Sequence, residues 1–110
     1  MEQDKLYIRH ILDAISIIEE YIQNFDFKMF LKNKLVQDGI IRELEIIGEA
    51  SKNLSSDIKD SIKEIPWKDI TGMRDKLTHE YFGVDLEAVW QTVKEDLPPL
   101  KDSLIKTLEK

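Results

Sequence analysis

The sequence contains no cysteine, and it has only three prolines and four glycines among its 110 residues. Without cysteine, disulfide bonds and thiolate metal sites are excluded. The chain also lacks an apolar run near the roughly 20 residues that a membrane-spanning helix needs, and its first five residues lack the cationic and apolar regions of a signal peptide. These absences predict a cytoplasmic protein without membrane contact, and no residue set points to a metal or other cofactor.

Basic residues are scarce relative to acidic ones. Lysine and arginine total 16 and aspartate and glutamate total 22, so the formal net charge is -6. This balance weighs against a general nucleic-acid binder, which normally carries a basic face. It is compatible with a small local phosphate site and with a basic partner. Hydrophobic residues make up 42% and charged residues 35%, a composition typical of a globular protein.

Strand patterns are missing as well, because apolar residues recur at helical spacing along almost the whole chain. This predicts an all-α, antiparallel bundle of about five helices in a single domain over residues 1–110. We expect long helices at 4–23 and 34–53, a short helix from 55 to about 64, and a helix from Pro66 through Tyr81. A further helix over 86–97 and a last amphipathic segment should be separated by a break or kink at Pro98 and Pro99.

Several residues have the chemistry of helix boundaries. Asp26, Ser55 or Ser56, and Asp85 precede apolar periodic segments and are expected N-caps. Gly83 is placed to end the helix that carries Tyr81. Gly48 falls inside a predicted helix, where a glycine costs about 1 kcal/mol relative to alanine, so we expect it to mark a helix crossing.

One stretch, residues 72–83, concentrates three side chains with useful chemistry: Arg74, His79 and Tyr81. The arginine can hold a phosphate, the imidazole titrates near neutrality, and the phenol offers a hydroxyl nucleophile. Successive helical residues advance by about 100°. Arg74 and Tyr81 therefore share one face, with Thr78 between them, whereas His79 points about 140° away from Arg74. Either the helix is distorted near Gly83, or two copies of the chain assemble the site.

Asp75 lies four residues before His79, so its carboxylate can reach the imidazole and orient it. This contact would raise the histidine pKa, and the helix C-terminus would act in the same direction. A structural interpretation of the same residues stays open. Arg74, Asp75 and Glu80 can form a solvated charged face, His79 can cap the helix end, and Tyr81 can belong to the core. By spacing alone, this second interpretation is the better one.

The stretch resembles the Arg-x4-His-x-Tyr motif of the HEPN superfamily, most closely that of its HepT-like branch. Further segments match that branch in order and spacing, and together they extend the resemblance to nearly the whole chain: YIRHILDAI at 7–15, IGEA at 47–50, IPW at 65–67, GMR at 72–74 and YFGVD at 81–85. The short motif is weak evidence, whereas the combination is specific.

The resemblance implies a helical homodimer whose motifs face a shared cleft. HepT-like proteins are toxins of toxin–antitoxin pairs, and their partner is a minimal nucleotidyltransferase. Many HEPN proteins are metal-independent ribonucleases acting on RNA such as tRNA or mRNA. By this resemblance Arg74 and His79 are the catalytic pair, and helix spacing adds Asp75 and Thr78 as supporting residues. Tyr81 matches the tyrosine that the partner modifies with AMP, which silences the toxin.

Two alternatives to a toxin ribonuclease remain at this point. In the first, the chain is a non-catalytic nucleotide- or substrate-binding subunit of the nucleotidyltransferase, with Arg74 and His79 holding a nucleotide phosphate. In the second, it is a structural helical dimer, which the motif disfavours. The acidic balance around the motif, where Asp69, Asp75 and Glu80 offset Lys68, Arg74 and Lys76, argues for recognition of RNA by shape more than by charge.

Overall fold

The computed structural model describes residues 2–79 and 85–109, with the side chains of α5 described as far as Met73. All regular structure in these residues is helical, as the sequence predicted. The elements are α1 (Glu2–Ile22), α2 (Phe27–Leu31), α3 (Lys34–Lys52), α4 (Ser56–Ser61), α5 (Trp67–His79), α6 (Leu86–Gln91), the π-helical segment η2 (Thr92–Asp96) and α7 (Leu97–Leu108).

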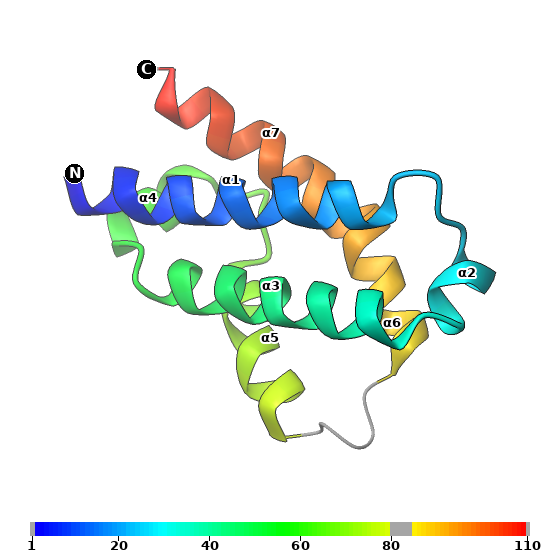
Figure 1. Cartoon of the computed structure of the whole chain (residues 1–110). Coiled ribbons are helices and arrows are strands. Elements are labelled where there is room, and N and C mark those ends of the chain that lie inside the picture. The colour runs from blue at the N-terminus through cyan, green and yellow to red at the C-terminus, as the bar shows by residue number, and fades with distance from the viewer. Residues whose placement is uncertain (1, 80–84, 110) are drawn as a thin grey trace.

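The bundle is built around α1 and α3, which run side by side in opposite directions (Figure 1). Helix α5 packs on α3, and α7 packs on α1. The short helix α2 turns the chain between α1 and α3 at one end of this pair. The antiparallel arrangement of the long helices confirms the predicted bundle.

The core is aliphatic and comes mainly from one face of each long helix. On α1 the predicted stripe is buried at Ile8, Ile11, Ile15 and Ile18, while Leu12 and Ile22 are half-buried at its edge. The steps of three and four residues keep these side chains on one face. Among the residues whose side chains are described, the remaining large buried apolar ones are Phe30, Val36, Ile40, Ile41, Leu44, Ile47, Leu54, Ile62, Ile65, Ile70, Val89, Val93, Leu97, Leu100 and Leu104.

A glycine lets α1 and α3 approach each other. A Cβ atom added to Gly39 on α3 would lie 2.5 Å from Cζ of Tyr21 on α1, so the aromatic ring occupies the space that a side chain would need. The sequence singled out Gly48 as the crossing position, and Gly48 is buried in α3. The close contact of Gly39 with an aromatic ring has no signature in the sequence, because Tyr21 is 18 positions away.

The predicted N-caps at Asp26, Ser55 and Asp85 are confirmed. Each side-chain oxygen accepts a hydrogen bond from a backbone N–H in the first turn: Asp26 from Met29 at 2.8 Å, Ser55 from Ile58 at 3.2 Å, and Asp85 from Glu87 at 3.0 Å. These bonds satisfy donors that have no partner within the helix. Gly83, the predicted helix end, lies outside the described residues.

The predicted end of the helix after Ser55 is too late. Helix α4 ends at Ser61, because Ile62 leaves the helical conformation with φ of -121° and ψ of 71°. Its carbonyl then accepts a hydrogen bond of 3.0 Å from the indole Nε1 of Trp67. Ile62 and Ile65 are buried. Burial of these two side chains and the tryptophan bond stabilise the early turn, and neither is visible in the local sequence.

The prolines do not break the last helix. The chain remains helical over residues 86–108, and Pro98 and Pro99 occupy the first turn of α7, where a missing N–H is tolerated. The irregularity lies before them, in η2, where the N–H of Leu97 bonds the carbonyl of Thr92 five residues back. The predicted break is therefore wrong, and a π-helical turn takes its place.

A buried carboxylate joins the start of α1 to the start of α4. Asp4 is only 5% exposed, and its two oxygens accept hydrogen bonds from the N–H and the hydroxyl of Ser55 at 2.8 and 2.7 Å. The backbone hydrogen bond from Ser55 holds the pKa of Asp4 below its ordinary value, even though burial opposes this shift. This link fastens the N-terminal end of the bundle.

Candidate functional site

Helix α5 carries most of the predicted motif, and its first half is fixed to the core. The carbonyl of Pro66 accepts bonds from the N–H groups of Asp69 and Ile70, each at 3.0 Å. Ile70 is 3% exposed, and Trp67 is half-buried with its indole bonded to Ile62. The beginning of α5 is therefore a rigid base for the residues that follow.

The second half of α5 contains Arg74, Asp75, Thr78 and His79 in its last two turns. Their backbone is α-helical up to His79, and their side chains lie outside the description. Tyr81 lies outside the described residues. The continuous α-helix preserves the predicted angle of about 140° between Arg74 and His79 on one chain. No distortion of the helix between Arg74 and His79 therefore places these two residues on the same face of α5.

A pocket of about 410 Å³ lies beside the first turns of α5. Helix α5 contributes Lys68, Asp69 and Met73 to its lining, and η2 contributes Thr92 and Asp96. The Thr92 hydroxyl donates a 2.9 Å hydrogen bond to the carbonyl of Ala88, one turn earlier. Met73, the last residue of α5 whose side chain is described, lines this pocket and precedes Arg74, so the pocket adjoins the predicted site.

Asp96 is an acidic member of this pocket that the sequence did not single out. Burial raises its pKa, and the negative charges of Glu95 and Asp69 act in the same direction. Although Asp96 remains exposed to solvent, its carboxyl keeps its proton to a higher pH than an ordinary aspartate does. No local pattern marks Asp96, because it lies 27 positions from Asp69 and joins it only through packing of η2 near α5.

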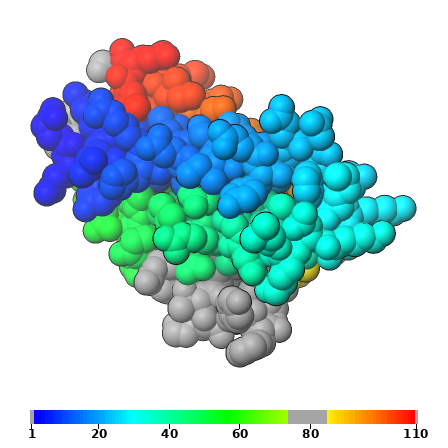
Figure 2. All heavy atoms as spheres, viewed as in Figure 1, coloured from blue at the N-terminus to red at the C-terminus, as the bar shows by residue number. Residues whose placement is uncertain are grey.

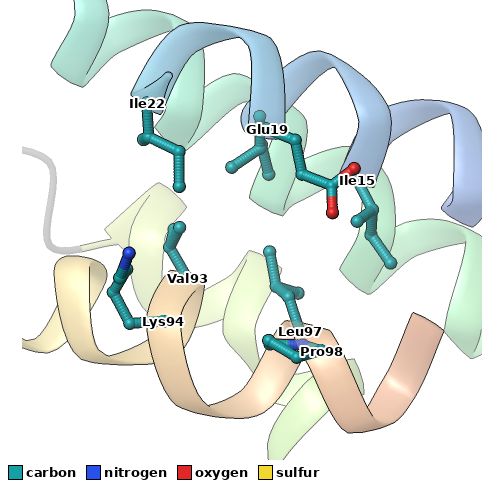
Figure 3. Close-up of a pocket in the computed structure, with 8 residues that line it drawn as sticks. Ile15, Glu19, Ile22, Val93, Lys94, Leu97 and Pro98 are labelled. Atoms are coloured by element: carbon teal, nitrogen blue, oxygen red, sulfur yellow. The ribbon is translucent and has the colours of Figure 1, made fainter. Parts of the chain in front are cut away.

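A second pocket, of about 210 Å³, separates α1 from η2 and the start of α7 (Figure 3). Its walls are mainly the aliphatic side chains of Ile15, Ile18, Ile22, Val93 and Leu97.

The two charged residues at this pocket are engaged elsewhere. Glu19 forms a 3.0 Å ion pair with Lys101, and the ammonium group of Lys94 lies 5.6 Å from the ring centre of Trp90. The pocket therefore offers little for binding or transferring a phosphate.

His10, the other histidine of the chain, is exposed on α1 and contacts the edge of the Tyr7 ring, with ring centres 6.0 Å apart. Among the described residues, no group of three or more histidine, aspartate or glutamate side chains could hold a metal ion. Within the same residues, no helix is long and apolar enough to cross a membrane.

Comparison with known proteins gives one consistent result. The family described as "Ribonuclease HepT-like" matches residues 11–107. A Thermococcus cleftensis protein named "Probable ribonuclease HepT" is 51% identical over 102 residues, which cover 93% of each chain. A Caldanaerobacter subterraneus protein named as a candidate RNase is 38% identical over 110 residues, covering 100% of this chain and 98% of the relative. No solved structure matches at a significant level.

One relative is longer than this chain. A protein of Methanocaldococcus jannaschii is 46% identical over 105 residues, which cover 96% of this chain and 47% of the relative. Its name joins a gamma-glutamylcyclotransferase to a candidate RNase. The chain therefore spans about half the length of that protein.

Proposed function

This chain belongs to the HepT-like ribonuclease family, and from this premise we propose that it is a metal-independent endoribonuclease and the toxin of a toxin–antitoxin pair. Arg74 and His79 form its catalytic pair. Asp75 orients the imidazole, and Thr78 lines the face between Arg74 and Tyr81. The proposal rests on the family and on the motif, which begins just after the first turns of α5 that are fixed to the core.

The observation that supports a shared site between two chains is the regular helix through His79. Because Arg74 and His79 point about 140° apart on one α-helix, one chain does not aim both at a single phosphate. Two copies related by a two-fold axis can bring Arg74 of one chain beside the histidine of the other. We therefore propose a homodimer with a symmetric cleft between the two α5 helices.

The chemistry requires only these side chains, the RNA and solvent water. The 2′-oxygen of the substrate attacks the adjacent phosphorus and loses its proton, and the bond from phosphorus to the 5′-oxygen breaks. One proton leaves the 2′-oxygen and one reaches the 5′-oxygen, and His79 carries out one of these transfers while solvent water carries out the other. Arg74 holds the phosphate and stabilises the charge that builds up in the transition state. The products are a 2′,3′-cyclic phosphate and a 5′-hydroxyl, whereas attack by water would give a linear phosphate.

Modification of Tyr81 would silence this site. A partner nucleotidyltransferase would join the Tyr81 oxygen to the α-phosphorus of ATP and release pyrophosphate. Tyr81 is seven positions from Arg74, the spacing that puts both on one face if the helix continues. The attached AMP would then occupy Arg74 and block the cleft, so one modification would stop both binding and catalysis.

A second function is favoured by the acidic surroundings of α5. Asp69 and Asp96 line the pocket beside the motif, and their carboxylates repel the many phosphates of a long RNA more than the few phosphates of one nucleotide. The alternative is a non-catalytic subunit that holds a nucleotide for the nucleotidyltransferase. It predicts nucleotide binding without RNA cleavage.

The deciding experiment measures RNA cleavage by the purified protein in the presence of a chelator. Intact mass first confirms that Tyr81 carries no AMP. Arg74→Ala and His79→Ala are compared with Arg9→Ala and His10→Ala, which change the same residue types at exposed positions on α1. We expect a loss of about 100-fold or more in the first pair and none in the second. A folded wild-type protein that leaves a broad RNA panel uncut would favour the nucleotide-binding subunit.

A further inference from the structure

We propose that the outer surface of α2 and the first turn of α3, here named the α2 corner (residues 28–35), docks a second protein that presents an apolar patch edged by carboxylates. This inference rests on the proposed function, because the occupant to which it commits is the nucleotidyltransferase that would modify Tyr81. Four observations support it: exposed apolar side chains, local charge, rigidity and position.

Exposed apolar side chains gather at the α2 corner. Six large hydrophobic side chains are exposed in the described part of the chain, and three of them lie within residues 29–35. Met29 is 45% exposed, Leu31 46% and Leu35 79%. In Figure 2 the cyan atoms of this segment form a projecting corner of the molecule. Apolar groups gathered on a surface mark interaction sites, and methionine adapts readily to a partner.

The charge of the α2 corner is opposite to that of the whole chain. Residues 27–37 contain three lysines and no acidic residue, although the chain carries a net charge of -6. Lys34 bonds Asp38 at 2.8 Å, so the positive charge offered to a partner comes mainly from Lys28 and Lys32. These cations would attract and orient a partner with carboxylates around an apolar centre. A symmetric contact between two copies would instead place the same lysines against each other.

The corner is held in place from inside. Phe30 is fully buried, with its ring centre 5.1 Å from that of Trp90 on α6, and Phe27 lies 6.1 Å from the same ring. The side-chain amide of Gln37 donates hydrogen bonds to the carbonyls of Phe30 and Leu31 at 2.9 and 3.1 Å. The exposed side chains therefore sit on a preorganised backbone, which lowers the entropic cost of binding.

The corner is also well placed for a protein that acts on Tyr81. Its inner aromatic face packs on Trp90 of α6, and α6 follows its N-cap Asp85, four positions after Tyr81. Chain length alone limits four residues to about 14 Å. A protein bound to the α2 corner thus lies beside α6, the helix that follows Tyr81 in the chain.

A protein fits this surface better than RNA does. Single-stranded RNA binds to aromatic side chains on which bases stack, whereas the exposed apolar side chains here are Met29, Leu31 and Leu35. The aromatic rings of α2 instead pack toward Trp90. Aliphatic side chains with lysines around them match a complementary protein surface.

The test titrates the purified minimal nucleotidyltransferase that is proposed as the partner into wild type and variants by calorimetry. Two double variants change the corner: Leu31→Ser with Leu35→Ser, and Lys28→Glu with Lys32→Glu. Two controls change the same residue types at exposed positions elsewhere: the single variant Leu6→Ser, and the double variant Lys63→Glu with Lys106→Glu. Thermal unfolding checks that all are folded. We expect Kd to rise at least about 10-fold in both corner variants and to stay near the wild-type value in the controls.

Each other outcome overturns the inference in a distinct way. Equal binding by wild type and corner variants removes the docking surface and leaves the proposed partner intact. Failure of the wild type to bind removes the partner itself. Weaker RNA binding by the corner variants, with unchanged protein binding, identifies an RNA surface. A fall in molecular mass of the corner variants in the ultracentrifuge identifies a contact between copies of this chain.

Discussion

Helix α3 packs between two neighbours of different character, α1 on one side and α5 on the other (Figure 1). Helix α1 presents a continuous aliphatic stripe, of which Ile8, Ile11, Ile15 and Ile18 are no more than 1% exposed. Helix α5 buries Ile70 alone among its described side chains, with 3% of the Ile70 surface exposed. Its last two turns are instead rich in polar and charged residues.

This contrast indicates that stability and chemistry are carried by different elements. The α1–α3 pair supplies apolar burial, the largest favourable contribution to folding. Helix α5 uses its first turns for attachment and its last turns for the motif. Changes in the α1–α3 pair should therefore lower stability without altering the chemistry of the folded protein. Changes beside the motif should alter that chemistry with little effect on stability.

The largest expected effect on stability comes from Ile11→Ala in α1. Ile11 is fully buried, so the change removes apolar burial and leaves a cavity, lowering the free energy of unfolding by about 2–5 kcal/mol. Ile17→Ala, at a position 39% exposed on the same helix, should cost about 1 kcal/mol or less. Urea unfolding measures both. If RNA cleavage per folded molecule also falls in Ile11→Ala, the separation between the two regions is wrong.

Asp4→Asn should cost about 1–3 kcal/mol at neutral pH, because the carboxylate accepts two bonds from Ser55. The pKa of Asp4 is lowered in the fold, so its contribution is present above the ordinary aspartate pKa of about 3.9 and is lost as pH falls through the folded value. The stability gap between wild type and variant should therefore close in acid. Asp13→Asn, at an exposed position on α1, is the matched control, and a pH-independent gap would contradict this account.

Trp67→Phe tests the junction between the two regions. It keeps most of the ring and removes the indole bond to the carbonyl of Ile62, which should lower unfolding stability by about 0.5–1.5 kcal/mol. Thermal unfolding gives the stability, and cleavage kinetics show whether the motif moves with the start of α5. A stability equal to that of wild type would mean that packing alone fixes this helix.

The smallest effect is expected for Asp96→Asn in the pocket beside α5. Loss of a carboxylate near the proposed RNA site should raise RNA affinity modestly, and added salt should weaken the gain. Because the pKa of Asp96 is raised, chiefly by burial, the wild-type group loses its charge at a higher pH than an ordinary aspartate. The difference between wild type and variant should therefore shrink as pH falls through that raised value. Fluorescence anisotropy with labelled RNA measures it, and Asp102→Asn on α7 is the control.

Most of the fold could be predicted because the signals are local. The apolar steps of three and four residues defined α1 and α3 to within two residues at each end, and Asp26, Ser55 and Asp85 marked helix starts. These signals depend only on helix geometry and on side chains that reach their own first turn. The predicted break at Pro98 failed because the prolines were tolerated at the start of α7.

The sequence by itself determined the all-α class, the helix boundaries set by local caps, and the motif that Arg74, His79 and Tyr81 form. Only the tertiary structure decided which distant residues meet. It joined Asp4 to Ser55 across 51 positions, set Tyr21 against Gly39, and placed Asp96 with Asp69 beside the motif helix. The physical reason is that periodicity specifies which face of a helix is buried, whereas packing specifies which helix covers it.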